Sequence, residues 1–168
     1  DSRLFEIVSY SILKFYYIEQ NIYWGYEIEK IEAENLKLYK TGRTNANDGG
    51  IDFVMKPLGR FFQVTETLDF KKYFLDIEKI EKYPITFVIK ATDSIDEIRK
   101  RIESDALKTY PVKAIVKKYL DCIEEIINIP TLKDHLQTVE QNGLLHQVLN
   151  EIILQSKIEF NYFEEDED

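Results

Sequence analysis

The first residues whose types suggest chemistry are Asp52 and Gln63, each inside a short apolar segment. The two segments, 51–56 and 60–66, are separated by Pro57-Leu58-Gly59. Proline suits the second position of a type I turn and glycine the fourth, so the stretch predicts a β-hairpin. If the turn closes between residues 56 and 59, Asp52 lies opposite Gln63. Because side chains alternate along a strand, Asp52, Val54, Gln63 and Thr65 then share one face.

This pairing would place a carboxylate and an amide oxygen across the ladder, with Cβ atoms roughly 5 Å apart. Two such oxygens can share one Mg²⁺ ion, which uses few protein ligands and keeps several waters. A metal held there polarises a phosphodiester and activates a water. We therefore expect Asp52 and Gln63 to be metal ligands for Mg²⁺, with Mn²⁺ as a substitute. The structural alternatives are a turn-closing role for Asp52 and a plain cross-strand role for Gln63.

Several further elements would position this hairpin. Apolar residues at helical spacing predict a helix over 3–18, and 36–40 alternate like a strand. Residues 19–35 have no clear period, and residues 41–50 form a turn-rich loop. Asp48 in this loop is interpreted as a loop-forming residue in preference to a metal ligand. A second helix is expected from about residue 69 to 82, followed by a buried strand at 85–89.

The rest of the chain is predicted to be helical. Ser94-Ile95-Asp96-Glu97 has the form of a capping box and opens a helix. Further helices are expected over 112–128 and from 131 to 158, the last interrupted near Asn142-Gly143. This order predicts an α/β (α+β) fold with a central mixed β-sheet flanked by helices and a helical C-terminal part.

A family resemblance emerges from three segments together. Phe5-Glu6 on the first helix, Asp48-Gly49-Gly50-Ile51-Asp52 before the hairpin, and Phe62-Gln63-Val64 resemble the Mrr-like branch of the PD-(D/E)XK nucleases. That branch consists largely of restriction endonucleases. The resemblance spans roughly residues 4–90, and residues 41–67 also resemble the ApaLI-like group of type II restriction enzymes.

The resemblance implies a restriction-endonuclease-like core and a Mg²⁺-dependent endonuclease that hydrolyses double-stranded DNA as a homodimer. It implies a metal carboxylate at Asp52, a second ligand at Gln63 and an outer-shell or second-metal carboxylate at Glu6. The family's lysine belongs two residues after the glutamine, where this chain has Thr65. A hydroxyl cannot replace an ammonium, so either Lys40 or Lys56 supplies the charge. Otherwise the chain is a catalytically inactive nuclease-fold module that binds DNA or protein.

Charge bears on the DNA-binding prediction. The formal net charge of -9 opposes phosphate binding, although the last five residues are all acidic and are expected to form a solvated tail. Arg43, Lys113 and Lys117 are the predicted DNA contacts. The alternative for the lysine-rich region 99–118 is a solvated helical surface.

The aromatic residues and the histidines indicate a function less specifically than the hairpin residues do. Residues 15–26 contain an aromatic cluster, which could stack on unpaired bases, although core packing or a subunit interface is favoured. His135 and His146 are too far apart to form an adjacent-turn metal pair and are interpreted as structural or exposed.

The chain of 168 residues fits one nuclease core over 1–92, a helical part over 93–160 packed on it, and a disordered acidic tail over 161–168. The apolar helical stretch 131–158 is a candidate dimer interface, although packing within the domain would use the same residues. With one cysteine, no leader pattern and no long apolar run, we expect a cytoplasmic protein without membrane segments.

Overall fold

The computed structural model describes residues 1–42 and 51–160. Arg43, Asp48 and the acidic tail, all named in the sequence predictions, lie outside the described residues. The helices are α1 (Ser2–Tyr17), α2 (Phe70–Lys79), α3 (Ile95–Thr109), α4 (Lys113–Leu120), α5 (Ile129–Gln141) and α6 (Leu145–Phe160), with a 3-10 turn at Ile28–Lys30. The strands are β1 (Asn21–Trp24), β2 (Glu32–Asn35), β3 (Lys37–Lys40), β4 (Phe53–Lys56), β5 (Arg60–Thr65), β6 (Ile85–Ile89) and β7 (Ile123–Ile127).

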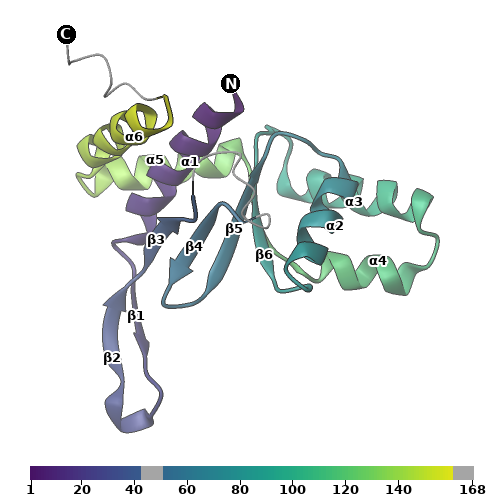
Figure 1. The fold of residues 1–168 in the computed structure, drawn as a ribbon, viewed down its shortest axis with the longest axis horizontal. Helices are drawn as coiled ribbons and strands as arrows, with labels where there is room; N and C mark the ends of the chain where they lie inside the picture. The colour runs from purple at the N-terminus through teal and green to yellow at the C-terminus, as the bar shows by residue number, and fades with distance from the viewer. Residues whose placement is uncertain (43–50, 161–168) are drawn as a thin grey trace.

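The predicted fold class is confirmed, because a central mixed sheet lies between two helical layers (Figure 1). The sheet order is β3-β4-β5-β6-β7, antiparallel from β3 to β5 and parallel from β5 to β7. One core cluster lies between the sheet and α1, α5 and α6. The other lies between the sheet and α2, α3 and α4.

The β4–β5 hairpin has the predicted register, with Phe53 opposite Phe62 and Met55 opposite Arg60. Phe53 and Phe62 are fully buried against α1, which fixes this pairing, since a one-residue slip would turn both rings to the other face. The turn itself differs from the prediction. The Gly59 N–H donates to the Met55 carbonyl, so the hydrogen-bonded turn spans five residues instead of the four of a type I turn.

The strand predicted at 85–89 is the central strand β6. All five of its residues are buried, because α1 covers one face and α2 the other. This explains its continuous apolar sequence. The capping box is also confirmed: the Ser94 hydroxyl accepts from the Glu97 N–H and the Glu97 carboxylate accepts from the Ser94 N–H, both at 3.2 Å.

The helix predicted over 112–128 is wrong beyond Leu120, because residues 123–127 form strand β7 beside β6. The physical reason lies in the adjacent Ile126 and Ile127. A strand sends neighbouring side chains to opposite faces, and these two enter different core clusters. The part of the chain after residue 93 therefore adds a strand to the sheet as well as helices.

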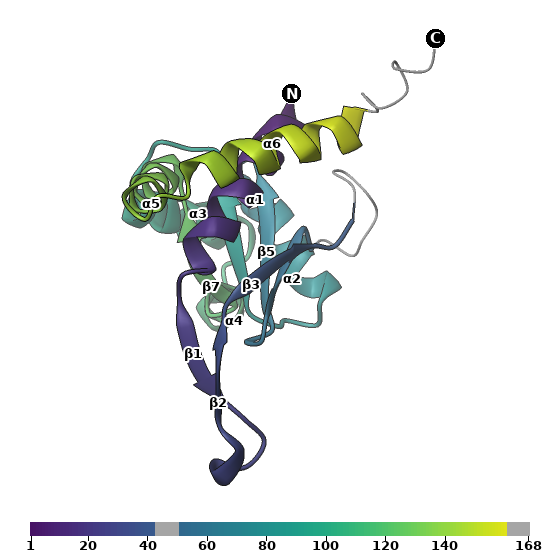
Figure 2. The ribbon, with the colours of Figure 1, turned by 90° about the vertical axis from the view of Figure 1, so that its left-hand side faces the viewer.

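Residues 21–35, which had no clear period, form a two-stranded antiparallel arm. Ile22 pairs with Glu34 and Trp24 with Glu32, and the Trp24 indole N–H donates to the Glu34 carboxylate at 2.7 Å. Figures 1 and 2 show this arm projecting away from the body of the molecule in both views. Across residues 1–42 and 51–160, every helix is too short or too polar to cross a membrane.

Ser94→Ala should lower the free energy of unfolding by about 1 kcal/mol, because the α3 N-terminus loses a hydrogen-bonded cap. Chemical denaturation of the variant measures the change. Ser104→Ala, at an exposed position inside the same helix, is the matched control and should change stability by less than about 0.5 kcal/mol. Equal losses in both variants would contradict the capping assignment.

His135 should make stability depend on pH. Its ring stacks on Tyr16 at 3.7 Å between centroids, and burial lowers its pKa, although Glu125 and Asp134 partly oppose this. Below the unfolded-state histidine pKa of about 6.5 the unfolded chain binds more protons than the folded chain. The contribution to stability is therefore present above that pH and is lost as pH falls from it through the lower pKa of the folded state. Thermal unfolding of His135→Gln should show a smaller loss of stability between pH ~7.5 and ~5.5 than the wild type. His146→Gln, at an exposed site, should behave like the wild type.

Candidate functional site

Asp52 is held at the point where β4 begins. Its backbone N–H donates to the Phe62 carbonyl at 2.9 Å, and its carboxylate Oδ2 accepts from the Val64 N–H at 2.7 Å. A strand N–H lies within the plane of its sheet, so the carboxylate stands in line with β4 at the end of the ladder. The Asp52 carboxylate thus takes the place of a backbone carbonyl as the acceptor for the Val64 N–H of β5. Val64 directly follows Gln63 in the sequence.

Gln63 and Thr65 face the α2 layer. Their strand neighbours Phe62 and Val64 pack toward α1, and Gln63 pairs with Phe87, which belongs to the α2 core cluster. Both polar side chains are buried, Gln63 with 8% of its surface exposed and Thr65 with 4%. The Thr65 hydroxyl accepts from the Thr67 N–H at 3.2 Å, which gives this residue a role in the turn after β5.

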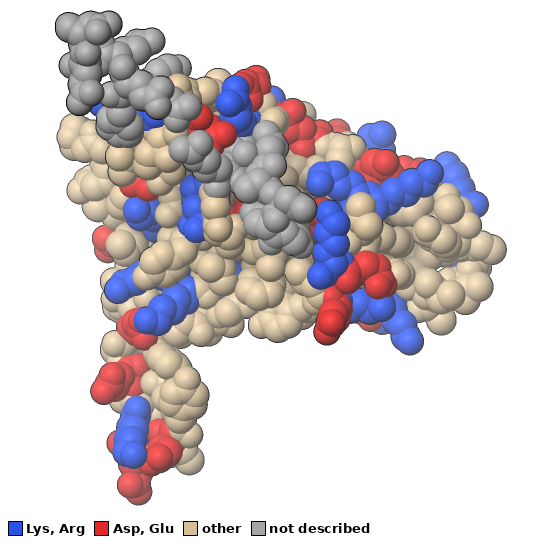
Figure 3. All heavy atoms as spheres, viewed as in Figure 1, with Lys and Arg blue, Asp and Glu red and all other residues tan. Residues whose placement is uncertain are grey.

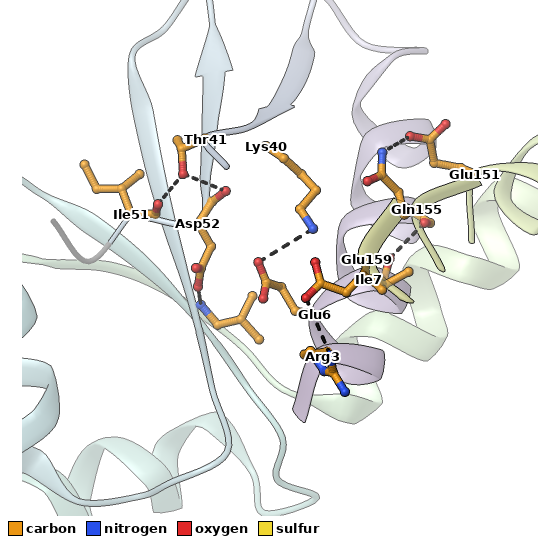
Figure 4. Close-up of polar contacts among 12 residues, drawn as sticks. Arg3, Glu6, Ile7, Lys40, Thr41, Ile51, Asp52, Glu151, Gln155 and Glu159 are labelled. Atoms are coloured by element: carbon orange, nitrogen blue, oxygen red, sulfur yellow. Dashed lines mark hydrogen bonds and ion pairs between the residues drawn. The ribbon is translucent and has the colours of Figure 1, made fainter. Parts of the chain in front are cut away.

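Glu6 and Lys40 meet on the opposite face of the sheet. Lys40 pairs with Phe53 on β4, so its side chain points toward α1, where Glu6 is buried. The Lys40 Nζ lies 3.8 Å from the Glu6 Oε1, and their side chains are only 11% and 7% exposed. Figure 4 shows Lys40 reaching from β3 toward Glu6, with Asp52 on the neighbouring strand.

Tyr10 forms one wall around this ion pair. The Lys40 Nζ lies 6.0 Å from the centre of the Tyr10 ring, and the Tyr10 hydroxyl donates to the Leu38 carbonyl at 3.2 Å. Burial, reinforced by Glu151, raises the pKa of Tyr10 to about 12, so its hydroxyl stays protonated at neutral pH. The Tyr10 side chain is therefore uncharged, and the Lys40 ammonium pairs with the Glu6 carboxylate.

The backbone brings Lys40 close to Asp52. The Thr41 N–H donates to the Asp52 carbonyl at 3.0 Å, which joins the end of β3 to the start of β4. Lys40 lies opposite Phe53, the next residue after Asp52, and paired Cα atoms in such ladders are about 5 Å apart. Asp52 at the start of β4, Lys40 on β3 and Glu6 on α1 therefore lie toward the same end of the hairpin.

Other predicted site residues lie elsewhere. Lys56 is at the turn end of β4, roughly 13 Å along the strand from Asp52, and its Nζ contacts the Glu34 Oε1 at 3.9 Å. It therefore does not supply a cation at Asp52. Lys113 and Lys117 lie on α4, in the layer on the opposite side of the sheet from α1, and Lys117 pairs with Asp121 at 2.8 Å.

A second set of charged residues at α1 was missed by sequence reasoning. Lys14 on α1 contacts Glu151 on α6 at 3.2 Å, and the Gln155 amide donates to the same carboxylate at 3.0 Å. Arg3 approaches Glu159 at 4.0 Å. Figure 4 shows these α6 carboxylates beside α1. Helical spacing places Glu151 and Glu159 on one side of α6, but the packing of α6 on α1 is not readable from that spacing.

The donor set restricts which metal fits. Asp52, Gln63 and Glu6 offer carboxylate and amide oxygens, the ligands that Mg²⁺ prefers. Within the part of the chain that the structure describes, three or more histidine, cysteine, aspartate or glutamate side chains never come together as a metal site. The arrangement thus fits a Mg²⁺ ion held by one or two protein oxygens and several waters. It does not fit a cage of three or more such side chains.

Comparison of the chain with protein-family models, with curated proteins and with solved structures finds no match.

The Glu6–Lys40 contact should contribute to stability as a coupled pair. Lys40→Met removes an ammonium that pairs with the buried Glu6 carboxylate and should lower the free energy of unfolding by about 1–3 kcal/mol, since the pair is almost completely buried. Glu6→Gln combined with Lys40→Met should cost less than the sum of the two single changes, as measured by urea denaturation of all four proteins. Lys37→Met, at an exposed position on the same strand, is the matched control. Additive effects would show that Glu6 and Lys40 do not interact.

Proposed function

We propose that this protein is a Mg²⁺-dependent DNA endonuclease of the restriction type, with its active site at the end of the β4–β5 hairpin. The observation that carries the proposal is the placement of Asp52. Its carboxylate is anchored on the Val64 N–H at 2.7 Å, and a buried lysine–glutamate pair reaches the same end of the hairpin. The element order α1, β3, β4–β5, α2, β6 supports the proposal, since it is the order expected for the nuclease core.

Each residue has a proposed role. Asp52 would hold the metal, together with the adjacent Gln63, whose amide must turn from the α2 side of β5 toward the end of the ladder. When bound, Mg²⁺ would polarise the scissile phosphodiester and supply an activated water. Lys40 takes the part of the lysine that is absent at Thr65, because its ammonium can stabilise negative charge on the phosphate. Glu6 positions Lys40 through their ion pair.

Charge assistance from Lys40 also answers the difficulty raised by Thr65. Thr65 faces the α2 layer, and its hydroxyl accepts a hydrogen bond from the Thr67 N–H in the turn after β5. A lysine at position 65 would therefore project from the face of the sheet opposite to Glu6. Lys40 already lies on the α1 face, one strand from Asp52. The charge is therefore supplied by β3 in place of β5.

A second function is favoured by two observations. Thr65 is committed to a structural hydrogen bond, and the Lys40 ammonium is engaged by Glu6. If that ion pair holds Lys40 away from the phosphate, the chain is a nuclease-fold module that binds DNA or protein without cutting. A homodimer acting on double-stranded DNA belongs to the first proposal, because cleavage of both strands requires two active sites.

The test is a cleavage assay on long unmethylated duplex DNA with Mg²⁺, with Mn²⁺ and with EDTA. Asp52→Asn is the informative variant, because its amide oxygen can still accept from the Val64 N–H while the metal-binding charge is lost. We expect discrete fragments that require the metal, and a rate at least about a hundredfold lower in Asp52→Asn. Lys40→Met should also lose cleavage, whereas Lys37→Met should retain it.

DNA binding measured on the same proteins separates the two proposals. Folded wild-type protein that retards duplex DNA but never cuts it in Mg²⁺ or Mn²⁺ would support the inactive module. Cleavage that persists at the wild-type rate in Asp52→Asn would overturn the proposed site, whatever the activity of the chain.

A further inference from the structure

The arm formed by residues 21–35 exposes apolar side chains that the rest of the described chain leaves uncovered. Tyr26 is 96% exposed, Ile28 89% and Tyr23 76%. An isolated two-stranded hairpin is at best marginally stable in water, and the arm projects clear of both helical layers (Figures 1 and 2). Large aromatic and aliphatic groups presented in this way are typical of an interaction surface.

The arm is also acidic. It carries Glu27, Glu29, Glu32 and Glu34 against a single basic residue, Lys30, which pairs with Glu27 at 3.1 Å. Figure 3 shows acidic atoms on the projecting arm, with basic atoms among them. A phosphate backbone would be repelled by this surface, so the partner of the arm is not a nucleic acid. The charge favours an apolar surface bordered by lysines.

Such a surface exists on the far side of the same molecule. A groove of about 420 Å³ runs between α2 and α4 and continues to the end of α3. Its apolar lining consists of Phe74, Leu75, Tyr110, Ile115 and Tyr119. Leu75 and Ile115 are each about half exposed, at 56% and 47%, so the groove presents uncovered apolar area.

The charges around the groove complement those of the arm. Lys71 lines it, and Lys118 lies one turn from Ile115 on the same side of α4. The one acidic residue in the lining, Glu78, is already neutralised by Lys82 at 2.9 Å and contacts the Tyr119 hydroxyl. The rim therefore offers net positive charge to an acidic ligand.

We propose that the arm of one copy docks into the α2/α4 groove of a second copy of this chain. Arm and groove lie at opposite ends of the molecule, so a chain cannot close the contact on itself (Figure 1). Tyr26 and Ile28 enter the apolar groove, and Glu29 and Glu32 meet Lys71 and Lys118. Two copies related by a twofold axis make this contact twice, each arm in the partner's groove, which closes the assembly as a dimer.

This interface does not depend on the proposed nuclease activity. Self-association can be measured without metal or DNA, so the two proposals can fail separately. It is also distinct from α6, whose outer face was the other candidate for a dimer contact. Leu149 and Ile153 are exposed on that face of α6.

A charge exchange between two variants tests the contact. Glu29→Lys/Glu32→Lys makes both arm and groove basic, and Lys71→Glu/Lys118→Glu makes both acidic. Each variant alone should dissociate with a Kd raised at least about tenfold over the wild type, by sedimentation equilibrium at up to about 100 µM. An equimolar mixture of the two should associate again, because each arm then meets a groove of opposite charge. All four positions are exposed, so the variants should fold, and circular dichroism checks this.

Three results would overturn the proposal. They are a wild-type protein that stays monomeric across this range, variants that associate as the wild type does, and a mixture that fails to recover association. A disulfide between Tyr26→Cys and Ile115→Cys, formed only between chains in a Cys122→Ser background, would support it directly. Its absence in a protein that dimerises would place the contact elsewhere.

Discussion

The pairing of β4 with β5, in the register that sets Phe53 opposite Phe62, is the constraint on which the rest of the structure depends. It sends both rings into the core under α1 and leaves Asp52 just outside the ladder. A shift of one residue would expose the aromatic face and move Asp52 away from the Val64 N–H. The same pairing orients β3, so it also decides that Lys40 points toward Glu6 and not toward α2.

Because of this register, the charged residues of the hairpin lie at its two ends. Its turn end carries Lys56, which is exposed and contacts the arm, whereas its open end carries Asp52 beside a nearly buried ion pair. A lysine and a glutamate buried together are costly to desolvate and contribute little stability compared with apolar residues of similar size. Their position beside Asp52 is therefore not explained by a gain in stability alone.

Much of this was readable in the sequence, for physical reasons. The hairpin register follows from alternation and from the position of Pro57 and Gly59, and β6 follows from its unbroken apolar run. Two features were not readable. Ile123–Ile127 has apolar spacing compatible with a helix or a strand, and only the free edge of β6 decides for the strand. The pairing of Lys40 with Glu6 was not readable either, because it depends on which face of the sheet α1 covers.

The residues of the candidate site were proposed from the sequence and stay a prediction, whereas their geometry was not readable from it. Asp52 and Gln63 were expected to face each other directly, whereas the Asp52 carboxylate bonds the backbone at Val64 and the Gln63 side chain turns toward α2. This difference arises because Asp52 lies one residue before the ladder begins, where its side chain can take the place of a backbone acceptor. A metal at this end of the hairpin must therefore be bound mainly through Asp52.

The most direct measurement is amide NMR of the folded protein titrated with Mn²⁺, whose unpaired electrons broaden the signals of nearby nuclei. We expect the amides of Lys40, Thr41, Gln63 and Val64 to broaden first. Asp52→Asn should remove this effect while the spectrum still shows a folded protein. Broadening confined to other acidic surfaces, such as the arm, or an unchanged pattern in Asp52→Asn, would contradict the placement of a metal site at Asp52.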